Sequence, residues 1–401
     1  MKNMLPYVSL YEYVYRQTEH AIVDADQKHA IYEEYKNIVT SSHLSDQVFI
    51  EVMNNFFYDI GLLSTSIKAL KIPDKQVGIK VRATKDALVV TKVLDDIRFV
   101  VGDEITQLSG DSIEYCRMRY HRLLKDEPYH REEWGHILTF QNEVEVKRAN
   151  QTYHFELRHY PVSTEHTIDV TVKDDVPILE FNGDIRFEQA VEALYKLSKI
   201  QESSKKVIFD FRNAQFKNLS IAEFLMPYFY EIGNQETILT KDTQVKVERE
   251  RHKSLFKQKL ERLYKACSEM NEQAFYQNIL DQPVGDWKFF DDDKIDFIGL
   301  SRFEEIVIFI DKDTSYAAEW LVYKVVRSGI VNLVGRPTSG NLAFFNIVDE
   351  IIDQRFILSF PVENLNQSIQ DDVVYPDTLI EWSKRHALVD KDIKFSIDNS
   401  S

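Results

Sequence analysis

The sequence predicts a multidomain protein that combines α/β and α+β architecture, and three features of the chain predict it. Residues 1–70 carry apolar side chains at helical spacing, which indicates an N-terminal helical cap. Residues 71–163 are rich in β-branched residues and glycine turns, which indicates a β-rich domain. In residues 164–401 buried strands alternate with amphipathic helices, as in an α/β core.

Composition limits the kinds of partner. The 401 residues are 44% hydrophobic, which suffices for real cores, and the formal net charge is −16. Such an acidic surface argues against nucleic acid and anionic membranes as partners. Cys116 and Cys267 lie far apart without a pairing pattern and are expected to be reduced thiols. Without a sustained apolar leader or a run of about 20 apolar residues, we expect a cytoplasmic protein.

In the cap, apolar residues indicate at least two helices. Ile31, Tyr35 and Ile38 recur at helical spacing. Ser45 precedes a second apolar series that includes Val48, and serine is a preferred residue at a helix N-terminus. Residues 7–70 are therefore expected to be helical.

The β-rich domain contains a glycine-bounded strand. Residues 77–81 and 87–93 are expected to be strands. In the segment 101–110, Gly102 and Gly110 provide the turns, and the apolar side chains between them face a core. Alternating apolar residues later in the domain predict a closing hairpin.

The segment 101–110 resembles the Gly-Asp-x-Ile-x-x-Ile-Asn-Gly segment of PDZ domains. This resemblance implies that an extended peptide adds as a strand to a sheet edge, with backbone N–H groups holding a terminal carboxylate. The candidate edge and loop are Gln76, Val77, Gly78, Ile79, Lys80 and Val81. Residues 117–138 are longer and more charged than a minimal PDZ helix, long enough to lie over the groove. Their histidines lack the spacing of a metal site, so no metal or cofactor is predicted.

An insertion near 236–298 interrupts the core pattern. A long charged helix is expected over residues 246–265. The acidic run 291–294 is expected to form a turn, because it lacks the ligand spacing and the glycine of a calcium-binding loop.

One stretch organises the core. Residues 305–310 form an apolar strand, residues 311–316 a polar turn, and a helix begins near Ala317. A strand-turn-helix of this kind presents one side chain at a helix N-terminus, where backbone N–H groups and the dipole favour developing negative charge. A hydrolase places a serine nucleophile there.

The same stretch resembles the tail-specific, or C-terminal processing, serine peptidases. Their Thr-x-Ser-Ala-Ala-Glu-like motif is matched by Thr314, Ala317, Ala318 and Glu319. Their second motif is matched by Val334, Gly335, Thr338 and Gly340. The resemblance implies a Clp-protease/crotonase-like core, and the cap, the PDZ-like domain and the core follow in the order of that family.

The residues that would perform the chemistry differ from the family pattern. The nucleophile position holds Tyr316, and the position of the lysine base holds Asn341. Where the relatives carry two glycines that expose oxyanion-binding backbone, this chain has Gln215 and Phe216. Residues 57–65, which correspond to a segment with a catalytic histidine in some relatives, contain no histidine.

Three hypotheses follow. The first is a catalytically degenerate homologue that acts as a cytoplasmic scaffold or regulator and binds a peptide or protein segment, possibly a C-terminus. The second is an active serine peptidase that cleaves near C-termini with a rearranged site at Ser315 or Ser339. The third is a structural subunit of an oligomer, and a homo-oligomer is compatible with all three. Tyr316 could also fill the vacated nucleophile pocket as a core residue.

Overall fold

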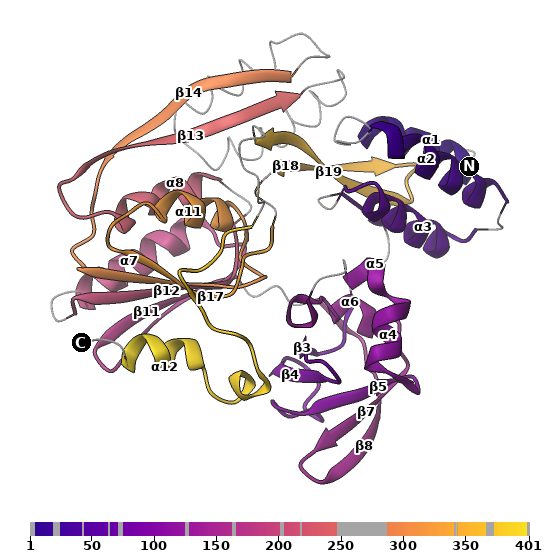
Figure 1. Cartoon of the computed structure of the whole chain (residues 1–401), viewed down its shortest axis with the longest axis horizontal. Coiled ribbons are helices and arrows are strands. Elements are labelled where there is room, and N and C mark those ends of the chain that lie inside the picture. The colour runs from indigo at the N-terminus through magenta and orange to yellow at the C-terminus, as the bar shows by residue number, and fades with distance from the viewer. Residues whose placement is uncertain are drawn as a thin grey trace. The chain divides into compact units, whose positions relative to one another are not determined.

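A computed structural model gives the structure of the chain and divides it into two compact units (Figure 1). The first unit comprises residues 1–73, 241–293 and 343–369, and the second comprises residues 74–240, 294–342 and 370–401. The structure describes residues 5–18, 25–41, 44–62, 65–70, 75–124, 128–162, 166–200, 204–216, 219–246, 287–340, 342, 344–365 and 373–398. The predicted domain limits at 70/71 and 163/164 stay predictions, because one compact unit can hold several domains.

The first unit packs three helices against an antiparallel sheet. The helices are α1 (Tyr7–Thr18), α2 (Ala25–Ser41) and α3 (Asp46–Asp59), and the strands include β1 (Ser66–Ala69), β18 (Phe344–Ile352) and β19 (Phe356–Leu365). Ser45 caps α3 as expected, because its hydroxyl accepts from the backbone N–H of Val48. Phe49 and Phe56 of α3 and Phe356 of β19 are fully buried in the shared core.

The insertion begins and ends in strands. Strand β13 (Gln235–Lys246) pairs with β14 (Trp287–Ile298) and with β19, so its backbone extends a sheet. The predicted turn at 291–294 is wrong, because pairing with β13 carries β14 straight through these residues. Apart from Lys246, which ends β13, the predicted charged helix over 246–265 lies outside the described residues.

The β-rich part of the second unit is a sheet in the order β3-β4-β5-β7-β8. These strands are β3 (Ile79–Ala83), β4 (Leu88–Val93), β5 (Glu104–Leu108), β7 (Glu143–Arg148) and β8 (Gln151–Glu156). Short elements complete it: β2 (Lys75–Gln76), β6 (Asp111–Ser112), β9 (Tyr160–Pro161), α4 (Ile113–Arg119), α5 (His121–Leu124), η2 (Tyr129–Arg131) and α6 (Gly135–Leu138). Gly102 and Gly110 adopt φ angles of 93° and 88°, so the predicted glycine turns are confirmed. Strand β3 is at the edge of the described sheet.

The α/β part of the second unit is a sheet in the order β10-β11-β12-β15-β17-β20. Strand β10 is antiparallel to β11, and the other neighbours are parallel. The strands are β10 (Thr167–Lys173), β11 (Val176–Gly183), β12 (Lys206–Phe216), β15 (Glu305–Ile310), β17 (Val331–Gly335) and β20 (Thr378–Leu379), and β16 (Ser315–Tyr316) pairs with β12.

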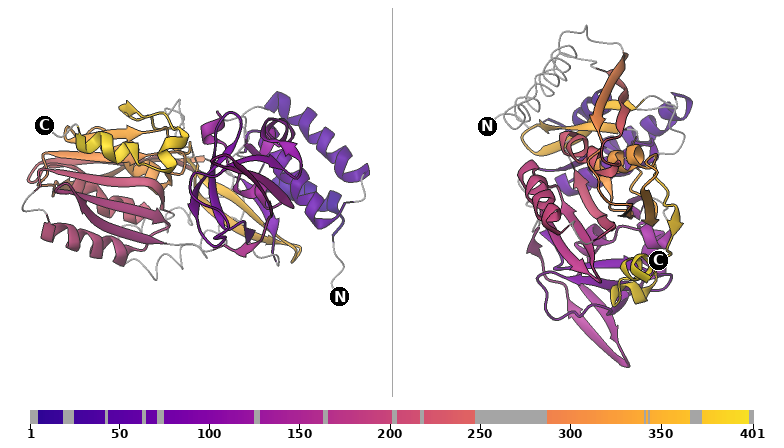
Figure 2. Two further views of the ribbon diagram at one scale, coloured as in Figure 1. Left: turned by 90° about the horizontal axis from the view of Figure 1, so that it is seen from below. Right: turned by 90° about the vertical axis from the view of Figure 1, so that its left-hand side faces the viewer.

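Helices cover both faces of this sheet (Figures 1 and 2). On one face lie α7 (Phe187–Ile200), α8 (Leu219–Leu225), η3 (Met226–Phe229) and α11 (Ala317–Val325). On the other face lies α12 (Lys391–Asp398), whereas η4 (Lys384–Ala387) lies against β4 of the β-rich part. Consecutive side chains of β12 point to opposite faces: Phe209 packs on Phe229 of η3, whereas Ile208 shares a core with Ile393 of α12.

Candidate functional site

The predicted strand-turn-helix forms at the centre of the α/β part. After the buried strand β15, the turn closes with two hydrogen bonds, from Thr314 N to Asp311 O (2.9 Å) and from Asp311 N to Thr314 Oγ1 (3.0 Å). Helix α11 begins at Ala317, as expected. Tyr316, immediately before it, has φ 57° and ψ −132°. A bulky residue adopts this conformation only where the surrounding structure enforces it, and such strain is typical of functional turns.

Tyr316 lies beside the end of β12. Strand β16 runs parallel to the end of β12, with Ser315 opposite Gln215 and Tyr316 opposite Phe216. Phe216 is fully buried against the rings of other phenylalanines, so it is a core residue. Gln215 is exposed, Tyr316 is half-buried, and Ser315 is buried. The turn therefore presents Tyr316 rather than Ser315.

A buried carboxylate joins helix α11 to the second motif. Glu319 has no exposed surface and accepts hydrogen bonds from Ser339 Oγ (2.9 Å), Gly340 N (2.8 Å) and Thr338 Oγ1. Ser339 is therefore brought to the first turn of α11, near the elbow, the turn at Tyr316 that precedes this helix. Asn341, the predicted replacement of the lysine base, lies outside the described residues.

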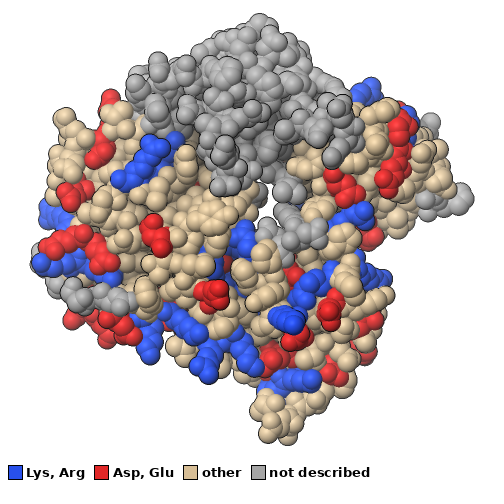
Figure 3. Space-filling model, viewed as in Figure 1, with Lys and Arg blue, Asp and Glu red and all other residues tan. Residues whose placement is uncertain are grey.

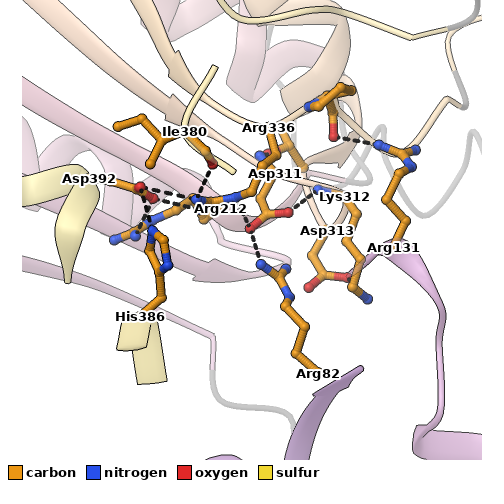
Figure 4. A network of polar contacts seen from close by, with 12 residues as sticks. Arg82, Arg131, Arg212, Asp311, Lys312, Asp313, Arg336, Ile380, His386 and Asp392 are labelled. Atoms are coloured by element: carbon orange, nitrogen blue, oxygen red, sulfur yellow. Dashed lines mark hydrogen bonds and ion pairs between the residues drawn. The ribbon is translucent and has the colours of Figure 1, made fainter. Parts of the chain in front are cut away.

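A network of buried ion pairs lies beneath the turn (Figure 4). Asp311 pairs with Arg82 Nη1 (2.7 Å) and Arg336 Nε (2.9 Å), and Arg336 continues to Asp392. Burial alone would raise the pKa of Asp311, but the charges of Arg82 and Arg336 hold that pKa well below its usual range. The network thereby fixes the turn to strand β3, to the loop after β17 and to α12.

The network continues at the carboxyl end of β12. Arg212 binds Asp390 (2.7 Å) and Asp392 (2.9 Å). His386 is buried, its Nδ1 accepts from Ser383 N (3.0 Å), and its Nε2 lies 3.8 Å from Asp392 Oδ1. Burial lowers the pKa of His386, and the Asp392 charge only partly opposes that effect. His386 is thus held as a neutral ring inside a charged cluster.

Residues 128–134 of the β-rich part contact both loops of the site, the turn after β15 and the loop after β17. Arg131 donates to the carbonyl oxygens of Pro337 and Thr338, at 2.8 Å each. Lys312 donates to Glu133 (2.6 Å). Helix η2 packs against the edge strand β3, so part of the long segment noted in the sequence lies beside the proposed edge.

The six residues of the proposed peptide edge have different environments. Gln76 is paired with Tyr160 in β2–β9, and Val77 and Ile79 are buried in the core. Gly78 has φ 66°, and its carbonyl oxygen accepts from the backbone N–H groups of residues 94–96. Lys80 is exposed and Val81 half-buried on β3, so the open part of the edge begins at Lys80.

Sequence reasoning missed the residues of the ion network. Arg82, Asp311, Arg336 and Asp392 are separated by up to hundreds of residues, and no local spacing relates them. Arg82 lies within a strand, and Asp311 and Arg336 each directly follow one, a signal that was noted only for the turn after β15, whereas Asp392 lies in α12. Among the described residues, no group of three or more His, Cys, Asp or Glu side chains could hold a metal ion.

No protein-family model matches the sequence, and no curated protein matches it. Among solved structures, the chain is similar to mature CPAF, with a TM-score of 0.67 and 10% identity over 97% of this chain and 95% of that one. Mature CPAF complexed with lactacystin gives the same TM-score and identity over 98% and 97%. A candidate peptidase from Parabacteroides merdae gives a TM-score of 0.50 and 11% identity over 98% and 96%. The fold is that of the tail-specific, C-terminal processing peptidases, as the sequence resemblance predicts.

In the part of the chain that the structure describes, no helix is both long and apolar enough to cross a membrane. On the face shown in Figure 3, Lys and Arg side chains lie among Asp and Glu side chains. The net charge of −16 therefore does not gather into one acidic surface on that face.

Proposed function

We propose that this protein is a catalytically degenerate homologue of the tail-specific peptidases and binds an extended peptide or protein segment as a scaffold or regulator. The observation that carries the proposal is Tyr316, which occupies the strained elbow before α11 with φ 57° and ψ −132°. This is the geometry that presents a nucleophile in hydrolases, and the side chain presented is a phenol. A phenol has an ordinary pKa of about 10 and places its oxygen several Å beyond a serine hydroxyl.

The environment of the elbow supports the same proposal. A serine peptidase needs bare backbone N–H groups for the oxyanion, and Phe216 and Gln215 instead continue β12 as a strand beside the elbow. The neighbouring hydroxyl of Ser315 is buried in that strand pair. The hydrogen bonds from Thr338, Ser339 and Gly340 to Glu319 do not require a serine at position 316, so the two motifs can stay joined in a non-catalytic homologue.

The β-rich part supplies the proposed ligand site, as a PDZ-like module. Strand β3 is the edge of its described sheet, and Lys80 and Val81 are accessible on it. A peptide strand could pair with this edge through backbone hydrogen bonds, and pockets on alternate residues would select the sequence. Gly78 makes the turn before β3, which is where a PDZ loop receives a terminal carboxylate.

Peptides selected from a random library with free C-termini test this binding. Hydrogen exchange on the full chain should show amides within residues 79–83 protected by a selected peptide. N-methylation of alternate ligand residues should abolish binding for one alternating set and spare the other, because strand addition uses every second ligand N–H. Protection confined to other parts of the chain, or tolerance of both methylated sets, would refute strand addition at β3.

A second candidate function has one specific observation in its favour. Ser339 Oγ donates to the buried Glu319 carboxylate at 2.9 Å, so an active peptidase with a rearranged site would use Ser339 as nucleophile and Glu319 as base. The same carboxylate also accepts from Thr338 and Gly340, which favours a structural role. Hydrolysis of a selected peptide that disappears in Ser339→Ala would establish this alternative in place of the first.

A further inference from the structure

A stripe of exposed apolar side chains runs along α7. Phe187, Val191 and Tyr195 follow one another at intervals of four residues and are 44%, 44% and 62% exposed. This spacing puts them on one side of the helix. The adjoining side of the helix is buried against the sheet through Ala190, Ala193, Leu194 and Leu197. The apolar surface of α7 is therefore wider than the part that its own fold buries.

Neighbouring aromatic rings widen the stripe. The ring of Phe187 lies 4.6 Å from that of Phe224 in α8, and the ring of Phe224 lies 6.2 Å from that of Tyr228 in η3. Phe224 and Tyr228 are both half-buried. Figure 2 shows α7 on the outer side of the helical layer. A contiguous exposed surface of this kind marks an interaction site more often than scattered apolar residues do.

The charges beside the stripe indicate the partner. The first half of α7 carries the exposed acidic residues Glu188 and Glu192, and the second half carries the exposed basic residues Lys196 and Lys199. When a second α7 packs antiparallel, the acidic half of each helix faces the basic half of the other. A parallel arrangement would oppose like charges. The pattern is self-complementary under a two-fold axis, which is the symmetry of most homodimers.

We propose that α7 forms a homodimer interface in which the stripe of Phe187, Val191 and Tyr195 packs antiparallel against the same stripe of a second copy. Val191 lies nearest the two-fold axis of such a contact, and Tyr195 lies toward each end, where Lys199 Nζ is 4.9 Å from the centre of its ring. A single helix pair with flanking aromatics is a small interface, so the dimer is expected to dissociate in the micromolar range. This inference is independent of the proposed peptide site on β3.

Sedimentation velocity of the full chain between about 1 and 100 µM tests the dimer. The wild type should shift from monomer to dimer across this range. Val191→Glu combined with Tyr195→Glu should remain monomeric throughout, a loss of about 30-fold or more in affinity. Ile97→Glu with Met118→Glu is the matched control, because it adds the same charge at exposed apolar positions of the β-rich part and should dimerise like the wild type.

A charge exchange tests the antiparallel arrangement. Glu188→Lys and Lys196→Glu should each weaken the dimer about fivefold, and the double exchange should restore it, because the two charges meet across the two-fold axis. A wild type that stays monomeric at 100 µM would overturn the proposal, as would a dimer that survives Val191→Glu with Tyr195→Glu. Failure of the double exchange to restore affinity would overturn the antiparallel arrangement.

Discussion

The backbone N–H of Gly340 donates to Oε1 of Glu319 over 2.8 Å, so a helix and a loop that meet at the candidate site share one buried carboxylate. Glu319→Ala leaves this N–H and two hydroxyl donors without their acceptor. We expect a loss of about 3 kcal/mol in the free energy of unfolding, and about 1–2 kcal/mol for Glu319→Gln, which keeps one acceptor oxygen. Urea titration of both variants measures the two losses.

Glu304→Ala is the control for this carboxylate. Glu304 pairs with Lys205 on the surface, where both side chains are mostly exposed, and its loss should cost less than about 1 kcal/mol. Equal costs for Glu319→Ala and Glu304→Ala would mean that the shared carboxylate does not hold the two motifs together.

The backbone at Tyr316 provides a second prediction. At an ordinary position, glycine is less stable than alanine by about 0.5–1 kcal/mol. Because φ is 57° at Tyr316, we expect the order to reverse, with Tyr316→Gly more stable than Tyr316→Ala by about 1–2 kcal/mol. Both variants lack the ring, so their difference isolates the strain. An alanine variant as stable as the glycine variant would show that the elbow relaxes when the ring is removed.

The ion network predicts a large cost for neutralising its centre. Asp311→Asn leaves the buried Arg82 without its carboxylate partner and weakens the pairing of Arg336. We expect a loss of about 3–5 kcal/mol, against less than about 1 kcal/mol for the exposed Glu304→Gln. Thermal unfolding at neutral pH, followed by circular dichroism, compares the two variants. A Tm for Asp311→Asn equal to that of Glu304→Gln would contradict the central place of Asp311.

His386 predicts a pH dependence of stability. Its pKa in the folded protein lies below the ordinary value of about 6.5 of an unfolded chain. The unfolded chain therefore binds the proton first, and the stability from the neutral ring is complete above pH 6.5 and is lost as the pH falls from there. Asn at this position can still accept from the Ser383 N–H without titrating. His386→Asn should reduce the change of the urea midpoint between pH 7 and pH 5. An unchanged pH dependence of the midpoint would show that other groups cause it.

Much of the fold followed from local patterns in the sequence. The strand before the turn, the helix at Ala317 and the glycine turns at Gly102 and Gly110 each depend on residues within one short segment. The strand character of residues 291–294 did not follow, because pairing with β13 overrides a local composition that favours a turn.

At the site, Tyr316 was located from motif spacing alone, and the structure adds the strained backbone. The network of Arg82, Asp311, Arg336 and Asp392 could not be predicted, because only the tertiary fold brings these charges together. The buried role of Glu319 was also hidden, since its donors come from a loop about twenty residues away.

The most direct test of the central claim is intact-mass labelling with a broad fluorophosphonate, in which a nucleophilic serine oxygen bonds to phosphorus and fluoride leaves. The wild type should show no adduct, because the elbow presents Tyr316. Tyr316→Ser combined with Asn341→Lys restores the two residues that the family pattern requires, and it is the companion sample in which labelling would show that the frame is intact. A stoichiometric adduct on the wild type, lost in Ser339→Ala or Ser315→Ala, would contradict the account and make the protein a serine hydrolase.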